Sequence, residues 1–409
     1  MLDFGVWQEI FSTMGKNKLR TFLTSFSVFW GIFILMILLG SGNGLQKGVM
    51  YNFSDAINSV WIWGGNTSIA YDGYNAGRNI VLKNEDVTLL SEYYPNLENM
   101  SARIDLWGGN HHTSYKNNYG DFGIQAINSG HQVTENLKLI DGRLLNNYDI
   151  ERFRKVAIIG RIVKERLFKE EEPVGKYVNI SGIPFLVVGV FDDVHDQETE
   201  RVYIPISIAQ KTFSPGNDVG TITFTLGNLS VAESEKLVEN IKNKLANKHK
   251  FDVNDKRAMG IANALKDYKQ MQSVFNGIKV FVGVIGVLTL IAGIVGVSNI
   301  MLIVVKERTK EIGIRKALGA TPRSIIGLIV LEALIITSVA GYLGLIAGVS
   351  ILELISNNMP ASDFFRNPSV DFFIALKAAF LVIIAGVLAG YIPARRASLI
   401  KPIEALRDE

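Results

Sequence analysis

The sequence has 409 residues, of which 48% are apolar, and a formal net charge of only +3. A positive mean hydropathy together with this apolar share indicates a membrane protein with a sizeable soluble part, and the small net charge gives no sign of nucleic-acid binding. There are no cysteines, which excludes disulfides, thiolate metal sites and cysteine nucleophiles.

The first twenty residues predict a helix with one apolar face. Trp7, Ile10, Phe11 and Met14 fall at helical spacing, and a basic cluster follows them. This pattern predicts a cytoplasmic amphipathic helix over 1–20 that lies on the inner membrane surface. A simple extension of the first membrane span is the alternative.

Four later runs are long and apolar enough to cross a membrane. The predicted spans are 21–45, 277–305, 325–352 and 372–392. A cleaved signal peptide is the alternative for the first run. The long preceding segment and the missing Ala-x-Ala site disfavour that alternative.

Lysine and arginine residues near the span ends predict the orientation. They cluster before the first span, in the loop 306–324 and in the tail 393–409, whereas the loop 353–371 holds only Arg366. Because positive loops stay in the cytoplasm, both termini and the loop 306–324 are predicted inside. The loop 353–371 and the long region 46–276 are then periplasmic.

The region 46–276 is too long for a simple loop. Short β-branched and aromatic runs alternate there with helical stretches, which predicts an α+β domain. The strands of 155–191 lie together, so a subdomain at about 115–215 is predicted to be inserted into one built from the flanking pieces. The predicted fold is four transmembrane helices with a large α+β periplasmic domain between the first and second.

The sequence predicts no catalytic, cofactor or metal site. No Gly-x-x-x-x-Gly-Lys-Ser/Thr phosphate loop occurs, so the chain is not expected to hydrolyse ATP. His111, His112, His131 and the acidic residues of 192–196 lack a metal-binding spacing, and solvated turns are the preferred interpretation.

The spans contain small residues and one carboxylate. Small residues allow close helix packing in lipid, within a bundle or a dimer. Glu332 is a functional candidate because it lies inside a span, and pairing near the inner interface is the favoured interpretation. The predicted packing glycines are Gly293, Gly296, Gly344, Gly348, Gly386 and Gly390.

The loop 306–324 has the pattern of a short, capped helix. Glu311 and Arg315 are spaced as an i,i+4 ion pair, and Ile314, Ala317 and Leu318 form one apolar strip. Gly319 is placed to end this helix. A rigid helix with an exposed apolar strip favours a docking element, and a solvated connector is the alternative.

The same loop carries a family resemblance. The segment 307–320 (ERTKEIGIRKALGA), preceded by 296–301 (GVSNIM), closely resembles the cytoplasmic signature of the MacB/FtsX superfamily of ABC transporter permeases. The segments 393–397 (PARRA) and 401–407 (KPIEALR) look like that family's C-terminal tail. Segments similar to its periplasmic core domain are 142–143 (GR), 156–160 (VAIIG), 173–176 (PVGK) and 185–190 (FLVVGV).

The resemblance implies a permease of the bacterial inner membrane, surrounded by lipid, that works by mechanotransmission as a homodimer or with a paralogous permease. A separate cytoplasmic ATPase subunit would bind ATP and Mg, as in split-subunit members without a fused ATPase domain. The residues that would couple to this ATPase are Glu307, Arg308, Glu311, Ile312, Gly313, Ile314, Arg315, Ala317, Leu318 and Gly319.

The function implied by the resemblance is export of a drug, a peptide or another periplasmic substrate, with a possible periplasmic adaptor and outer-membrane channel. A lipoprotein-releasing permease of the same superfamily is the first alternative. A non-transporting cell-envelope signalling or cell-wall regulatory protein is the second. The small net charge gives no reason to expect a nucleic-acid partner.

Overall fold

The computed structural model describes residues 18–51, 56–106, 112–193, 195–214, 216–360, 362 and 364–400. Most of the predicted N-terminal amphipathic helix and the tail residues 401–409 lie outside this part of the chain. The chain divides into two compact units, one formed by 1–52 with 272–409 and the other by 53–271.

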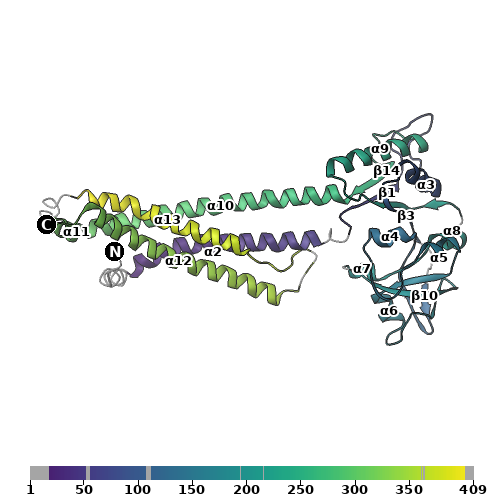
Figure 1. Ribbon diagram of the computed structural model, residues 1–409, viewed down its shortest axis with the longest axis horizontal. Coiled ribbons are helices and arrows are strands. Elements are labelled where there is room, and N and C mark those ends of the chain that lie inside the picture. Colours follow the sequence, from purple (N-terminus) through teal and green to yellow (C-terminus); the bar gives the residue numbers. More distant parts are fainter. Residues whose placement is uncertain are drawn as a thin grey trace. The chain divides into compact units, whose positions relative to one another are not determined.

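The first unit is built from long apolar helices that run alongside one another (Figure 1). Each is long and apolar enough to cross a membrane. They are α2 (Lys18–Tyr51), α10 (Ala264–Glu307), α12 (Pro322–Asn358) and α13 (Phe372–Ser398), and the short α11 (Thr309–Ala317) lies between α10 and α12. All four extend past the predicted apolar spans, because polar residues can continue a helix beyond the hydrocarbon layer.

Helix α12 packs against both α2 and α13. Glycines make these contacts close. A Cβ on Gly344 would lie 2.5 Å from the backbone oxygen of Phe29, and one on Gly348 would lie 2.6 Å from the Cβ of Met36. Because the helix backbones leave no room there for a side chain, these small residues pack α12 onto α2 within one chain.

The other predicted glycines divide into two groups. A Cβ on Gly386 or Gly390 of α13 would overlap with atoms of α12. Gly293 and Gly296 of α10 face α2 more loosely, because a Cβ there would meet its nearest atoms at 3.8 and 3.9 Å. Among the six predicted glycines, the tight contacts are therefore those of α12 with α2 and α13.

The second unit is a mixed sheet flanked by short helices. Its strands are β1 (Ser59–Gly64), β2 (Leu82–Lys83), β3 (Glu98–Asp105), β4 (His112–Tyr115), β5 (Asn118–Asp121), β6 (Gly123–Ile127), β7 (Lys138–Gly142), β8 (Val156–Gly160), β9 (Tyr177–Ile180), β10 (Ile183–Asp192), β11 (Arg201–Pro205), β12 (Asp218–Val219), β13 (Thr221–Thr225) and β14 (Met259–Asn263). Its helices are α3 (Asn84–Tyr93), α4 (Ser129–Thr134), α5 (Asn147–Glu151), α6 (Arg161–Leu167), α7 (Asp196–Thr199), α8 (Ile206–Thr212) and α9 (Val231–His249).

The strand order in the main sheet is β14-β1-β13-β3-β6-β11-β8-β10-β9-β4-β5, with β7 paired to β10. The strands of the middle segment (about 115–215) lie together with β4 at one end of this order, and β14, β1, β13 and β3 lie together at the other end. The antiparallel β3–β6 pair joins the two sets into one sheet. The division into two subdomains stays a prediction.

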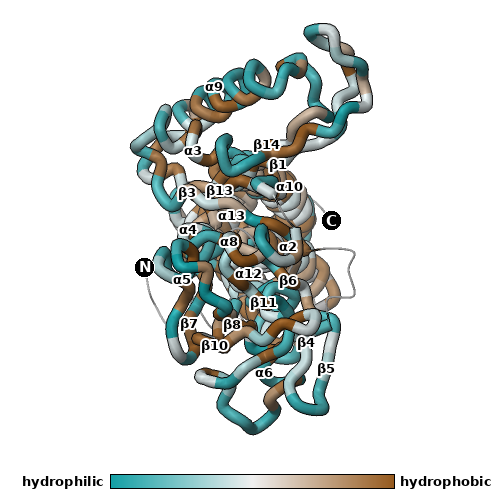
Figure 2. Tube along the Cα trace, turned by 90° about the vertical axis from the view of Figure 1, so that its right-hand side faces the viewer, coloured by the Kyte–Doolittle hydropathy of each residue, from teal (hydrophilic) through white to brown (hydrophobic). Residues whose placement is uncertain are grey.

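Apolar residues of the strands and of the covering helices form the core of this unit. All five residues of β8 are buried, which accounts for its uninterrupted apolar run. Helix α9 starts at a capping box of Ser230 and Glu233 and buries Ile241 and Leu245. Figure 2 shows hydrophobic and hydrophilic turns alternating along α9, as expected for a helix with one face on a core.

Candidate coupling site

The candidate site is the short helix α11 and the ends of the long helices around it. Arg308 separates α10 from α11, and the next long helix starts after Thr321. Gly319 has a φ of +97° and donates its N–H to the oxygen of Lys316, while Ala320 donates to the oxygen of Arg315. This is a Schellman ending, which satisfies carbonyls at the end of α11 and depends on a glycine at this position.

The start of α12 is also capped. The hydroxyl of Thr321 accepts a hydrogen bond from the Ser324 N–H at 3.3 Å, and Pro322 occupies the first turn. The helix end predicted at Gly319 is therefore present, and Thr321 caps the start of the next helix. The turn between α11 and α12 is short and defined on both sides.

Helix α11 has one buried face and one exposed face. Ile312 is 7% exposed and belongs to the apolar core of the long helices, and Gly313 is also buried. Ile314 is 45% exposed and Leu318 is 83% exposed. Ile312 and Gly313 therefore anchor α11 to the bundle, and the strip of Ile314, Ala317 and Leu318 faces outward.

Charged side chains connect α10, α11 and α12. Arg308 places Nη1 3.2 Å from Oε2 of Glu332, and its Nε lies 3.6 Å from Oε2 of Glu311. Arg315 donates to Glu311 at 2.8 Å, so the predicted i,i+4 pair is formed. Glu332 is 4% exposed and is paired with Arg308, whereas its place near the inner membrane interface stays a prediction.

A second connection ties α11 to the end of α13. The ammonium of Lys316 donates to the backbone oxygens of Ser398 and Ile400 at 2.8 and 2.7 Å. Lysines commonly bind the last carbonyls of a helix, where the helix dipole is negative. The sequence analysis missed Lys316, because its partners lie more than eighty residues away in the chain.

A cavity of about 530 Å³ lies beside α11. Apolar residues of α10 and α12, including Met301 and Leu328, form most of its wall. Its charged lining consists of Arg308, Glu311, Arg315 and Glu332. The side chains of the ion pairs described above therefore line one hollow.

The histidine candidates lie elsewhere, in the second unit. His112 places Nδ1 2.6 Å from Asp121, and His111 lies outside the described residues. The expectation of a solvated turn is wrong for His131, which is completely buried. Burial, and then the positive charges of Arg103 and Arg201, lower the pKa of His131 to about 3.

Two family profiles match this chain, and together they cover most of its length. The profile of the MacB-like periplasmic core domain matches residues 21–244, which is more than half of the chain, and that of the FtsX-like permease C-terminal domain matches 283–402. The chain belongs to the MacB/FtsX superfamily. It is therefore an ABC transporter permease and a multi-pass inner-membrane protein with a MacB-like periplasmic domain.

Members of the MacB/FtsX superfamily match along nearly the whole chain. The macrolide export ATP-binding/permease protein MacB of Wolinella succinogenes is 27% identical over 99% of this chain and 61% of its own length. The pyoverdine export ATP-binding/permease protein PvdT of Pseudomonas entomophila is 27% identical over 98% of this chain and 59% of its own. The chain thus spans about three fifths of the length of these relatives.

One solved structure from the MacB/FtsX superfamily is similar to the second unit. It is the periplasmic region of MacB from Actinobacillus actinomycetemcomitans, with a TM-score of 0.43 and 23% identity, and the match covers 55% of this chain and 95% of that one.

Proposed function

We propose that this permease transmits the conformational change of a cytoplasmic ATPase to its periplasmic domain, and that α11 is the element on which the ATPase acts. The observation that carries the proposal is the combination of an exposed apolar strip with buried and ionic anchors on one short helix. Leu318 is 83% exposed, whereas Ile312 is buried and Arg308 and Lys316 bind α12 and α13.

The anchors determine how a force on α11 would spread. The helix has a defined end at Gly319 and is bonded to three long helices, so it can move only together with them. Helix α10 is one continuous element that starts at Ala264, directly after β14. A displacement of α11 would therefore be carried along α10 toward the periplasmic domain.

The proposed partner is an ATPase that binds ATP and Mg and docks on Ile314, Ala317 and Leu318. The names of the relatives combine an ATP-binding part with a permease part, which supports such a partner. Two permease chains would bind two ATPase subunits. Export of a drug, a peptide or another periplasmic solute is the proposed outcome, with a periplasmic adaptor and an outer-membrane channel as further components.

This proposal requires α11 in the cytoplasm and the second unit in the periplasm. Because the chain has no cysteine, a single one can be introduced at Asn117, which is exposed between β4 and β5, or at Leu318. In intact cells an impermeant maleimide should label Asn117→Cys and leave Leu318→Cys unlabelled until the inner membrane is opened. The opposite labelling pattern would overturn the orientation and the ATPase contact with it.

The same Leu318→Cys variant tests the contact directly. A short bifunctional cross-linker in native membranes should join it to a protein that binds ATP. Ile312→Cys is the matched control, because this position on α11 is 7% exposed and should give no product.

A further inference from the structure

The bundle of long helices contains an apolar groove of about 510 Å³ among α2, α10 and α13. Aliphatic side chains form most of its wall, such as those of Leu35, Leu39, Val284 and Leu381. Among the described residues that line the groove, Lys377 of α13 is the one that carries a charge. The groove therefore combines a long apolar wall with a single cation.

Two glycines of α10 explain the shape of the groove. A Cβ on Gly286 would lie 2.5 Å from Cδ1 of Leu35, so α10 and α2 are in close contact at this level. One turn earlier, a Cβ on Gly283 would have no described neighbour within 4 Å, although Gly283 lines the groove. Glycine in a helix interior is less favourable than alanine, and no described helix packs closely on this one. The space at Gly283 is therefore open to a molecule outside the chain.

Lys377 places its charge inside a segment that is long and apolar enough to cross a membrane. It lies about 8 Å along the axis of α13 from the first residue, Phe372. A cation at this depth is unfavourable in hydrocarbon unless it is paired or reaches the headgroup layer with its flexible side chain. Among the described residues, none forms an ion pair with Lys377, and the lining of the groove includes no carboxylate. Its counter-charge must come from outside the chain.

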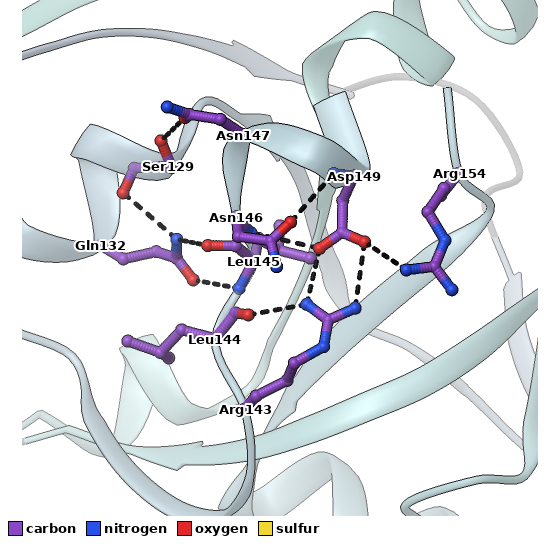
Figure 3. Close-up of polar contacts among 9 residues, drawn as sticks. All are labelled: Ser129, Gln132, Arg143, Leu144, Leu145, Asn146, Asn147, Asp149 and Arg154. Atoms are coloured by element: carbon purple, nitrogen blue, oxygen red, sulfur yellow. Dashed lines mark hydrogen bonds and ion pairs between the residues drawn. The ribbon is translucent and has the colours of Figure 1, made fainter. Parts of the chain in front are cut away.

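Two other sites show how this chain balances its cations where protein surrounds them. In the periplasmic unit, Arg143 and Arg154 donate to the carboxylate of Asp149 at 2.6 and 3.1 Å (Figure 3). The hollow beside α11 is lined by arginines and glutamates together. The groove at Lys377 differs from both, because its charge is not balanced. It is complementary to a ligand that is apolar along most of its length and anionic at one end.

A second lysine lies on the face of α10 that borders the groove. Lys279 precedes Gly283 by four residues and Gly286 by seven, so the three share one side of the helix. Lys279 is exposed, and its neighbour Val280 lines the groove. Basic pockets between membrane helices are typical sites for anionic lipid headgroups.

We propose that this groove binds an anionic phospholipid, with an acyl chain along the apolar wall and the phosphate beside Lys377. The acyl chain fills the space at Gly283, and Lys279 adds positive charge near the headgroup. The lipid belongs to the leaflet in which α13 begins, which the predicted orientation makes the periplasmic one. The inference rests on α13 as a membrane span and is independent of the role of α11.

The test measures lipid affinity of the full-length chain in a non-ionic detergent by native mass spectrometry. The protein is titrated with dioleoyl phosphatidylglycerol or with dioleoyl phosphatidylcholine, which have the same acyl chains and differ in the charge of the headgroup. We expect the first phosphatidylglycerol to bind roughly fivefold more tightly, the usual contribution of one lysine close to an anionic lipid.

One pair of variants tests the charge. Lys377→Gln should lower the affinity for phosphatidylglycerol roughly fivefold and leave that for phosphatidylcholine unchanged. Lys306→Gln is the matched control, because it removes an exposed lysine at the other end of α10. It should change neither affinity.

A second pair tests the space. Gly283→Leu fills the groove with a side chain and should weaken the binding of both lipids. Gly277→Leu is the matched control on the same helix, because a Cβ there is equally free of described neighbours and Gly277 is not part of the lining. Thermal unfolding of each variant verifies that the fold is kept.

Three results would overturn the proposal. They are equal affinity for the two lipids, an affinity for phosphatidylglycerol unchanged in Lys377→Gln, and lipid binding unchanged in Gly283→Leu. Native mass spectra also report the oligomeric state. Loss of a dimer in Gly283→Leu with lipid binding retained would show that the groove is a contact between two copies of the chain instead.

Discussion

Arg308 and Glu332 form an ion pair of 3.2 Å that joins the end of α10 to α12 at the edge of the apolar bundle. The side chain of Glu332 is 6% exposed and that of Arg308 is 21% exposed. A buried charge that loses its partner is strongly destabilising. The pair therefore helps to hold α10, α11 and α12 together as one unit.

Glu332→Gln should destabilise the bundle by about 1–3 kcal/mol, which is less than for a fully buried pair because Arg308 keeps some contact with water. The exposed pair partner Glu311 is the matched control, and Glu311→Gln should cost at most about 1 kcal/mol. Thermal unfolding in detergent measures both. Equal effects of the two substitutions would contradict the importance of the buried pair.

Close packing of α12 on α2 gives a second prediction. In Gly344→Val the new side chain would overlap with the backbone of Phe29, and overpacking of this kind costs about 1–3 kcal/mol. Gly327 is the control on the same helix, because a Cβ there has no neighbour within 4 Å. Gly344→Val should lower the unfolding temperature and Gly327→Val should not. A similar decrease in both variants would show that the low helix propensity of valine causes the effect, and that overlap with Phe29 does not.

Buried His131 predicts a pH dependence of stability. Its pKa is about 3 in the folded chain and 6.5 without the protein environment, so the unfolded chain takes up a proton first as the pH falls. The contribution of His131 to the free energy of unfolding is present above pH 6.5 and is lost as the pH decreases toward 3. Linkage gives a loss of about 1.4 kcal/mol between pH 7.5 and 5.5.

Comparison with His131→Leu isolates this contribution. Burial raises the pKa of nearby Glu135, which acts in the opposite direction, but this carboxyl is present in both proteins. Denaturant unfolding at the two pH values should therefore show a larger decrease for the unsubstituted chain. The same decrease in both proteins would show that His131 does not remain neutral.

The sequence predicted the elements of the coupling site but not their contacts. Long apolar runs identified the four spanning helices, and Gly319 marked the end of α11 because the local geometry there requires a glycine. The pairing of Arg308 with Glu332 depends on the relative rotation of two helices, which no local pattern determines. The strand order in the periplasmic unit depends in the same way on pairing between distant segments.

The error at His131 has a related cause. A histidine among polar residues is typical of an exposed turn, but tertiary packing buries α4 against the sheet. The composition of a short segment cannot predict which of its faces the rest of the domain covers.

The most direct test of the coupling proposal is ATP hydrolysis and transport by the complex of this permease with the ATPase identified by cross-linking. Leu318→Asp places a charge in the proposed apolar contact, which is worth on the order of 1–3 kcal/mol. It should release the ATPase and abolish transport while membrane insertion is unchanged, whereas Glu311→Gln should have a small effect. Full ATPase binding and transport in Leu318→Asp would show that α11 is only a solvated connector.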